Sequence, residues 1–543
     1  MKHFEIRDKF RKFFESKNHK WVESSSLLPN DPSVLFTTAG MQQFKPYYVG
    51  GADPMKDFGS LNTASIQKCV RTSDVDEVGD ERHLTFFEML GNFSFGGYFK
   101  KEAITWAHEF ITSPEWMNLN IDYVTVFEGE EGVPADTESE EIWKKLGVSD
   151  IRKSGCADNF WGPTGDEGPC GPTTEIYVDG IEIWNIVFNQ YYQNKDKTLK
   201  PLETPGIDTG MGLERLALVS QFPGQVGEKT VFETDLLQPI MASIGTIGDI
   251  KSERIRLIAD HIRSLTFLVA DGIIPGKEER NYIPRRLFRD AMTSHYLFAG
   301  FGLDTEFFDQ PLNSVIEIYK ESYPYLALGK YGEIRDILRK EADDYAEILR
   351  LIGNISDLKR YYNSFKPKKN WPNVSNGKID LDGAALFGIR QSKGVSWKQM
   401  QLVAESVGYS FSSDTLKEYD IAYYDHQEKS RAGAEKKFGG HGLILDTGEL
   451  KASTPEEMEK VIKLHTSTHL LHASLRKVLG EEVHQAGSDI TAERLRFDFT
   501  FPRKLTPEEI KQVEDLVNGA IQKDYAVTKE EMSYEEAVKT GAL

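Results

Sequence analysis

Short apolar runs lie among helical segments in the first 225 residues, which are rich in aromatic residues, Gly and Pro. The runs at 34–37, 85–90 and 181–188 are strand-like. This mixture predicts an α+β domain around an antiparallel sheet. We place the first domain at residues 1–225.

Beyond residue 225 the pattern changes to long helical periodicity. Apolar residues recur at helical spacing through 254–271 and 331–352, which predicts a helical bundle over 226–438. Glycines at 439, 440 and 442 mark a hinge, and a third, α/β domain is expected over 439–543. Its predicted elements are helices at 456–479 and 507–523 and a strand at 494–501.

Composition narrows the class of protein. The chain has 543 residues, enough for about two to four domains. A formal charge of -20 argues against nonspecific coating of nucleic acid, although local basic patches remain compatible with a nucleic-acid partner. Three cysteines without CxxC spacing indicate a reducing compartment. With no apolar run of membrane-spanning length and a charged amphipathic start, we expect a cytoplasmic protein without a membrane partner.

The segment 205–215, PGIDTGMGLER, carries the densest candidate chemistry. Asp208 is expected to end a strand, while Gly210 and Gly212 let the backbone approach a ligand before a helix begins. Asp208 can receive an ammonium group, and Arg215, one to two turns into the helix, can reach a phosphate. The alternative is a glycine-rich turn that caps an ordinary helix.

Two further strands carry candidate ligand contacts. On the strands expected at 68–72 and 83–96, Arg71 can hold a phosphate, and Phe86 and Phe87 must face opposite sides, so only one can stack on a base. On 181–188, Asn185 and Val187 share a face suited to a small amino acid. There is an alternative for each strand. The phenylalanines could simply pack in the core, and 181–188 could be a buried strand in which Asn185 has its hydrogen bonds made within the protein.

Basic clusters in the helical part are candidates for phosphate contacts, with solvated helix faces or loops as the alternative. They are Arg285, Arg286 and Arg289, and Lys366, Lys368 and Lys369.

Several long motifs together resemble one family. They are SSSLLPNDPSVLFTTAGMQQFK (24–45), CVRT, TFFEMLGNFSFGGYF (85–99), DNFW, GDEGPCGPTTEI (165–176), EIWNIVF and DTGMGLER, followed by IADHIRSLTFLVADG (258–272), HQEKSRAGAEKKF (426–438) and KLHTSTHLLHASLRKVLG (463–480). In this order they resemble the alanyl-tRNA synthetases, which are class II aminoacyl-tRNA synthetases. The resemblance covers nearly the whole chain and is weakest between about 290 and 420.

The resemblance implies an ATP-dependent ligase that activates alanine as alanyl-adenylate and transfers it to the 3' end of tRNA(Ala). It assigns the α-phosphate of ATP to Arg71, adenine to Phe87, the γ-phosphate to Arg215 and the alanine ammonium to Asp208. A pocket for a methyl group would be shaped by Met41, Trp161, Asn185, Val187 and Gly210. The attacking carboxylate is already ionised, so positioning and charge neutralisation by arginines and Mg²⁺ matter more than a general base. Glu175 and Glu182 are both candidate ligands of Mg²⁺.

A methyl-sized pocket rejects glycine and serine weakly, by roughly 1 to 3 kcal/mol per group. The segment HTSTH places His465 and His469 four residues apart, at metal-ligand spacing, and resembles the first half of the family's editing-site zinc motif. In the family, the other half of the zinc motif is a Cys and a His further downstream. This chain has no cysteine after Cys170. We therefore expect a partial editing domain at 439–543 and leave open whether Zn²⁺ binds or the histidines are structural. His472 and His484 would complete a site only by coincidence.

The helical domain departs from the family's pattern for reading the tRNA acceptor stem. Pro275, Gly276 and Lys277 replace a P-S-N stretch, and Gln391 falls where an acid is usual. Altered acceptor-stem recognition is therefore expected. The family's C-terminal extension has no counterpart here, which predicts a monomer. Two alternatives stay open: an RNA-binding paralogue without charging activity, and a ligase for another small carboxylate or acceptor.

Overall fold

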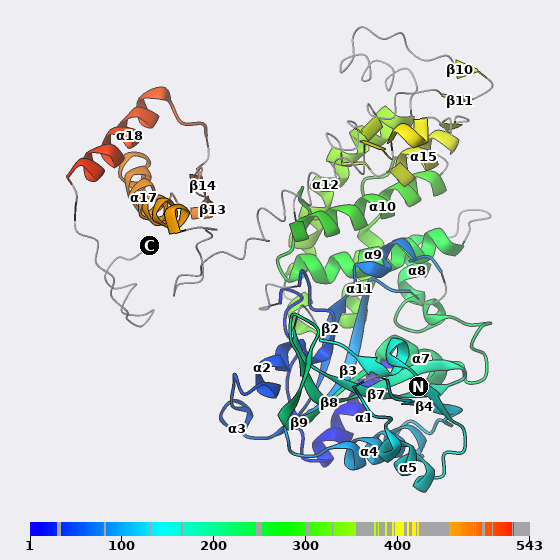
Figure 1. Ribbon diagram of the computed structural model, residues 1–543. Coiled ribbons are helices and arrows are strands. Elements are labelled where there is room, and N and C mark those ends of the chain that lie inside the picture. Colours follow the sequence, from blue (N-terminus) through cyan, green and yellow to red (C-terminus); the bar gives the residue numbers. More distant parts are fainter. Residues whose placement is uncertain are drawn as a thin grey trace. The chain divides into compact units, whose positions relative to one another are not determined.

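The computed structural model of the chain is shown in Figure 1. It describes residues 1–29, 34–80, 83–130, 132–163, 167–245, 252–277, 279–299, 303–327, 329–353, 374–375, 378–379, 386–387, 394–395, 397–406, 410–411, 415–419, 421–422, 455–481, 483, 485–490, 495–501, 503–523 and 525. The chain divides into two compact units, Met1–Tyr419 and Asp420–Leu543, and each is described by itself.

A nine-stranded sheet forms the centre of the first unit. Its strands are β1 (Lys20–Trp21), β2 (Asn62–Val70), β3 (Phe86–Ser94), β4 (Tyr123–Phe127), β5 (Ile151–Ser154), β6 (Phe160–Trp161), β7 (Gly168–Val178), β8 (Ile181–Gln193) and β9 (Leu199–Gly212). The order is β1-β2-β3-β9-β8-β7-β4-β5, with β6 paired to β7. Only β1–β2 and β4–β5 are parallel among these pairs. The prediction of an α+β domain on an antiparallel sheet is confirmed.

The strand predicted at 34–37 is wrong. These residues form an irregular loop without a strand ladder, and Thr37 bonds to residues 26–27 and to the last residue of β2. Thr37 donates its N–H to the Leu27 carbonyl and its hydroxyl to the Ser26 carbonyl, and it accepts from the Val70 N–H. The strands predicted at 85–90 and 181–188 are present as β3 and β8, and both run further along the chain.

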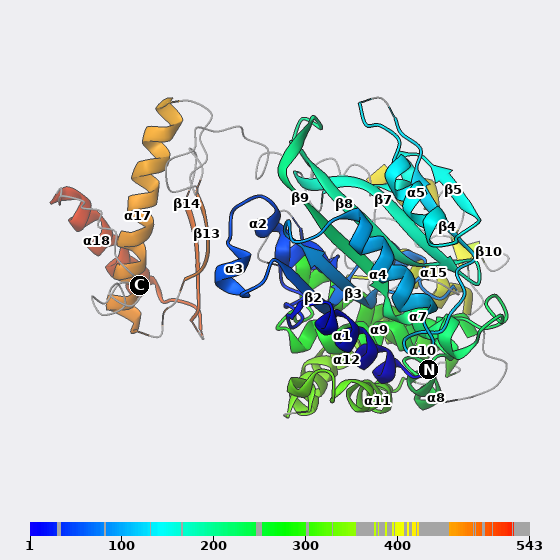
Figure 2. The same ribbon diagram turned by 90° about the horizontal axis from the view of Figure 1, so that it is seen from below.

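Helices α1 (His3–Ser16) and α4 (Lys100–Thr112) cover one face of the sheet, side by side in Figure 2. Phe10 of α1 and Phe110 of α4 meet edge to face at 5.7 Å, and both contact Trp184 of β8. Since neighbouring residues of a strand point to opposite faces, residues 183, 185 and 187 of β8 face away from this aromatic core.

Helices α8 (Gln238–Ile244), α9 (Ser252–Ala270), α10 (Tyr282–Phe298), α11 (Asp309–Tyr319), α12 (Lys330–Gly353) and α15 (Trp397–Ser406) follow, with α7 (Leu213–Gln221) joining them to the sheet. The helices predicted at 254–271 and 331–352 are α9 and α12. Short strands β10 (Val374–Ser375), β11 (Lys378–Ile379) and β12 (Ser410–Phe411) form a separate small sheet.

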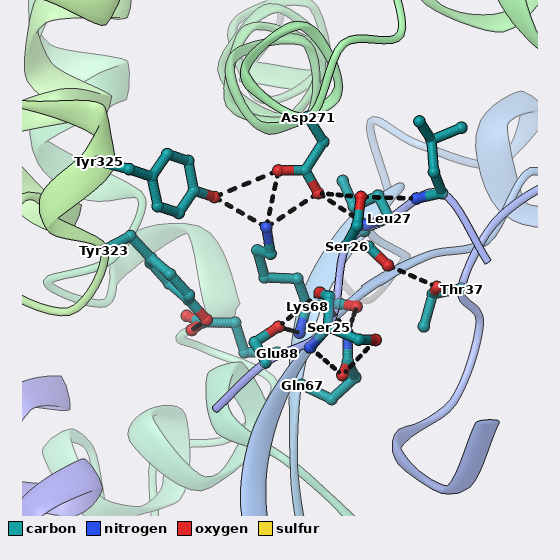
Figure 3. A network of polar contacts seen from close by, with 12 residues as sticks. Ser25, Ser26, Leu27, Thr37, Gln67, Lys68, Glu88, Asp271, Tyr323 and Tyr325 are labelled. Carbon is teal, nitrogen blue, oxygen red and sulfur yellow. Dashed lines mark hydrogen bonds and ion pairs between the residues drawn. The ribbon is translucent and has the colours of Figure 1, made fainter. Parts of the chain in front are cut away.

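Buried polar contacts connect the helical part to the sheet (Figure 3). Asp271, directly after α9, accepts the Lys68 ammonium of β2 at 2.9 Å and the Leu27 N–H at 2.7 Å. The Tyr325 hydroxyl bonds the same lysine at 2.8 Å. Tyr323 donates to Glu88 of β3, which also pairs with Arg7. These contacts hold the end of α9 against β2 and the loop that precedes residue 38.

The second unit contains α17 (Pro455–Leu479), β13 (Gln485–Ile490), β14 (Leu495–Phe499) and α18 (Pro507–Gln522). The two strands pair antiparallel, and Leu475, Val483 and Val513 form a small core with the aromatic residues of β14. The helices and the strand predicted in this part are confirmed. Throughout the part of the chain that the structure describes, no helix combines the length and apolarity needed to cross a bilayer.

Candidate active site

A cavity of about 340 Å³ lies on the face of the sheet opposite α1 and α4. Among its lining residues are ten predicted from the sequence: Arg71, Phe87, Trp161, Glu175, Glu182, Asn185, Val187, Asp208, Gly210 and Arg215. The strand register brings them together, because Val187 of β8 pairs with Asp208 of β9 and Asn185 pairs with Gly210. Residues two apart share a face, so one strand pairing fixes four of the positions.

Asp208 forms the acidic end of the cavity. It is 5% exposed, and burial raises the pKa of its carboxyl to about 7. Within the described part of the chain, no side chain donates a hydrogen bond or a positive charge to it. A buried carboxylate without a cation is costly, and a ligand that brings an ammonium group would remove this cost.

Gly210 lines the cavity near Asp208 and, having no side chain, leaves room there for a small group. A Cβ at this position would lie 2.8 Å from the Met89 Sδ, closer than real side chains approach. Val187, 4% exposed, and Trp161 also line this end of the cavity. The strand β9 continues through Gly210 to Gly212, so the prediction that the strand ends at Asp208 is wrong by four residues. The continued pairing with β8 and β3 is the physical reason.

Asn185 and Glu175 form a polar wall next to Asp208. The Asn185 Nδ2 donates to the Glu175 Oε1 at 3.0 Å, which leaves the buried Asn185 Oδ1 without a hydrogen-bond partner among the described residues. Glu175 also accepts from the Tyr177 hydroxyl at 2.9 Å and the Thr125 hydroxyl at 3.3 Å. Burial, and next the charge of Glu182, raise the pKa of Glu175 to about 7. The wall therefore presents an unused acceptor to a ligand.

Arg71 and Arg215 form the cationic end of the cavity. The Arg71 guanidinium lies 5.0 Å from the centre of the Phe87 ring, and its Nε donates to the Thr38 carbonyl at 3.4 Å. Arg215 pairs with Glu182 at 2.8 Å, and its side chain is 45% exposed. It is the third residue of α7, in the first turn and not one to two turns in, because the helix starts directly after β9.

Phe86 and Phe87 point to opposite sides of β3, as predicted. Phe86 is fully buried and stacks on Phe267 of α9 at 4.2 Å and 4°. Phe87 faces the cavity beside Arg71. The ring available to a base is therefore Phe87.

Met41 is placed beside the cavity and not on its wall. It is 1% exposed in the short 3-10 turn Gly40–Phe44 and belongs to a cluster with Phe44 and Phe93. Trp161 packs against this cluster and does line the cavity. The turn directs Met41 into the aromatic cluster. Met41 therefore supports the cavity wall from behind and does not form the direct ligand contact that we expected.

The sequence did not single out His83 and Glu214, which also line the cavity. His83 bonds Asp80 at 2.5 Å and Glu77 at 3.0 Å. Glu214 is 2% exposed and pairs with Arg263 of α9 at 2.9 Å. The one local signal for Glu214 is its place directly before Arg215 in the motif at 205–215.

The basic cluster of α10 is largely paired internally. Arg289 is 1% exposed, bonds Glu341 at 2.5 Å and donates to the Gly394 carbonyl at 2.9 Å, so the predicted phosphate contact is wrong for this residue. Arg285 approaches the same Glu341 at 3.3 Å, and Arg286 approaches Asp290 at 3.6 Å. Both are partly exposed and stay candidates. Gln391 and Lys366, Lys368 and Lys369 lie outside the described residues.

His465 and His469 lie on one face of α17, with ring centres 5.0 Å apart. His472 lies one turn further, its Nε2 3.5 Å from the Val483 carbonyl, and His484 is outside the described residues. In the described ranges no group of three or more His, Cys, Asp or Glu residues is arranged to hold a metal ion. Among the described residues the structure thus shows two neighbouring histidines, which is fewer than a zinc site needs.

Comparisons with known proteins agree on one family. Residues 5–485 match the model of the class II tRNA synthetases (A). The alanine–tRNA ligase of Treponema denticola is 39% identical over 99% of this chain and 89% of its own length, and that of Borrelia hermsii is 37% identical over 100% and 90%. A solved pyrrolysyl-tRNA synthetase from Desulfitobacterium hafniense matches 43% of this chain and 72% of its own, at 13% identity and a TM-score of 0.23.

Proposed function

The chain belongs to the class II tRNA synthetases (A), and we propose that the cavity on its sheet is where alanine and ATP react before transfer to tRNA. The chain is an ATP-dependent alanine–tRNA ligase, like its relatives of nearly the same length. The family predicted from the motifs is confirmed. The observation that carries the proposed site is the buried Asp208 carboxylate, which has no cation as partner among the described residues and lies close to a glycine.

Alanine fits the acidic end of the cavity. Its ammonium group would pair with the Asp208 carboxylate and can also donate to the free Asn185 Oδ1. Its methyl group would lie over Gly210, between Val187 and Trp161, where little further volume is open. The pairing of charges inside a buried site supports this orientation, because it compensates the desolvation of the carboxylate.

ATP fits the cationic end. Phe87 offers one ring face for adenine, Arg71 can neutralise the α-phosphate, and Arg215 the γ-phosphate. With the alanine ammonium paired to Asp208, the alanine carboxylate would attack the α-phosphorus in line. The bond between this phosphorus and the α,β-bridging oxygen would break, and the β- and γ-phosphates would leave together as pyrophosphate. Orientation and charge neutralisation by these side chains are the catalytic contributions, since the nucleophile needs no deprotonation.

Mg²⁺ is the expected companion of ATP, and Glu182 fits it better than Glu175. Glu175 already accepts hydrogen bonds from Asn185, Tyr177 and Thr125. Glu182 is partly exposed, and its partner Arg215 would turn to phosphate when ATP binds. The ion would neutralise phosphate charge when bound.

The three parts of the chain are assigned as follows. Residues 1–225 would form the adenylation domain, 226–438 a domain that recognises tRNA(Ala), and 439–543 part of an editing domain. Arg285 and Arg286 are the phosphate contacts proposed for the second. His465 and His469 would supply two ligands of a zinc site that needs others. We further propose that the protein is cytoplasmic.

Pyrophosphate exchange with a panel of amino acids tests the function, together with charging of tRNA(Ala). We expect exchange that depends on alanine, and charging. Exchange without charging would favour a ligase with another acceptor, and no exchange would favour an RNA-binding paralogue.

Two variants locate the site. Arg71→Ala should abolish most exchange, and Arg152→Ala, an exposed arginine paired to Asp150 outside the cavity, is the matched control. Equal activity of the two variants would place the reaction elsewhere.

A further inference from the structure

Arg263 of α9 reaches from the helical part of the chain into the sheet. It is 0% exposed. One terminal nitrogen, Nη1, donates to the Glu214 Oε1 at 2.9 Å and to the Tyr319 hydroxyl at 3.2 Å. The other, Nη2, donates to the backbone carbonyl of Phe86. One planar group therefore bonds α7, α11 and β3 at once.

Of the three residues that Arg263 bonds, two directly precede proposed ATP contacts. Phe86 precedes Phe87, and Glu214 precedes Arg215. Glu214 is bonded from its other side as well, because its Oε2 accepts the Glu88 N–H of β3 at 3.2 Å. The guanidinium and this carboxylate thus join the adenine end of β3 to the first turn of α7.

The Phe86 ring fixes the same strand a second time. It stacks on Phe267, one turn further along α9, and the Arg263 guanidinium lies 5.2 Å from the centre of the ring. Because Phe86 cannot turn, Phe87 is held on the opposite face of β3, toward the cavity.

The charge balance argues for a role in geometry. Burial raises the pKa of Glu214, and the Arg263 charge acts against that rise. A buried pair such as this adds little net stability, since desolvation of both charges offsets their attraction. Its planar, forked donors instead fix distances between three elements, which a lysine with one ammonium cannot do.

Two other groups at α9 hold neighbouring segments of the cavity. The Asp260 Oδ1 accepts the Thr85 N–H at 3.0 Å, at the start of β3. Asp271 binds Lys68, three residues before Arg71 (Figure 3). The nucleotide end of the cavity is therefore supported from a helix that lies outside residues 1–225.

We propose that Arg263 is a positioning residue for ATP in the adenylation step, acting through Phe86 and Glu214 on Phe87 and Arg215. This inference rests on the proposed assignment of Phe87 and Arg215 to ATP. It gives α9 a part in amino-acid activation that is separate from any contact of the helical domain with tRNA.

Arg263→Lys tests the proposal in pyrophosphate exchange, because it keeps the charge and removes the fork. We expect the KM for ATP to rise about tenfold, the size of one lost hydrogen bond to a charged group, and the KM for alanine to stay within about twofold. The KM for tRNA in charging at saturating ATP should not change. An unchanged KM for ATP, or a rise only in the KM for tRNA, would overturn the proposal.

Lys100→Met is the matched control for loss of a buried ion pair. Lys100 pairs with Asp136 at 2.6 Å, with side chains 6% and 1% exposed, and neither residue lines the cavity. It should lower the melting temperature while the KM for ATP stays unchanged. If it raises the KM for ATP as much as Arg263→Lys does, the effect is one of stability and the proposal is refuted.

Phe87→Ala and Arg215→Ala separate this inference from the proposed function. If neither raises the KM for ATP, the ATP assignment itself fails. If both raise it and Arg263→Lys does not, only the role of Arg263 fails.

Discussion

Asp208→Asn should change stability and activity in opposite directions. The substitution keeps the shape of the side chain and removes its charge. In the free protein the charge is unfavourable, since the carboxylate is 5% exposed and no cation faces it among the described residues. With alanine bound, the same charge is needed to pair with the ammonium group. The variant therefore tests whether this carboxylate is kept for the substrate.

The effect on stability follows from the pKa of Asp208. Burial raises this pKa from 3.8 to about 7, so the folded protein binds the proton more tightly than the unfolded chain. Stability is then highest below pH 4, falls as pH rises toward 7, and stays at its lower value above pH 7. The shift of roughly three units corresponds to at most about 4 kcal/mol. Asp208→Asn should raise the melting temperature of the ligand-free protein at pH 8 and leave it nearly unchanged near pH 4.

The effect on activity comes from the unpaired ammonium group. Removing one partner of a buried charged pair costs about 2 to 5 kcal/mol, which is roughly 30-fold to several thousand-fold in kcat/KM for alanine. The KM for ATP should stay close to that of the unchanged enzyme. In the unchanged enzyme, kcat/KM for alanine should rise about tenfold per pH unit up to about pH 7 and then level off. Asp208→Asn should remove this slope.

Differential scanning calorimetry at pH 4 and pH 8 measures the melting temperatures, and exchange kinetics over the same pH range measure kcat/KM for alanine. Glu175→Gln is the control, because the pKa of Glu175 is also raised to about 7 in the same cavity. If Glu175→Gln removes the pH slope and Asp208→Asn keeps it, the ammonium site is assigned to the wrong acid. A lower melting temperature of Asp208→Asn at pH 8 would refute the argument from burial.

Three other substitutions have separable outcomes. Gly210→Ala places a Cβ 2.8 Å from the Met89 Sδ, so Met89, which also lines the cavity, must shift. The KM for alanine should then rise about tenfold in exchange while the KM for ATP stays unchanged, and an unchanged KM for alanine would contradict the proposed pocket. Met41→Ala should lower the unfolding free energy by about 2 to 5 kcal/mol while the KM for alanine changes by less than about threefold, since Met41 supports the wall without forming it; thermal melts and exchange report both. Glu182→Gln should raise the Mg²⁺ concentration needed for half-maximal exchange; an unchanged requirement with a lower KM for ATP would mean that Glu182 only neutralises Arg215.

Local periodicity was enough to predict the orientation of side chains within single strands. The period of two along β8 places Asn185 and Val187 on one face, and along β3 it separates Phe86 from Phe87. These inferences succeed because they depend on backbone geometry alone. The same reasoning failed at 34–37, where an apolar run bonds to a loop and to the end of β2 and forms no strand.

Contacts between segments far apart in the chain could not be predicted from the sequence pattern. Arg289 looked like a surface cation, yet it bonds Glu341, 52 residues later, and is buried. Met41 was expected on the cavity wall, and packing with Phe93 places it behind that wall. No sequence pattern indicated a role for Arg263, because a charged residue on a helix usually faces water. Only the fold brings the Phe86 carbonyl to its guanidinium.

Three of the acids that line the cavity, Glu214, Glu175 and Asp208, differ in the groups that compensate their charge, and this difference determines what each can do. Glu214 has the Arg263 charge and a backbone N–H, so it is fixed whether or not a ligand is present. Glu175 has only neutral donors, which direct its oxygens toward Asn185 and away from a metal ion. Among the described residues Asp208 has neither a hydrogen-bond donor nor a cation as partner, and so a ligand would have to supply one. A substrate without an ammonium group would leave that charge buried and unpaired, so under the proposed assignment recognition in this cavity would depend on the free amine of the amino acid.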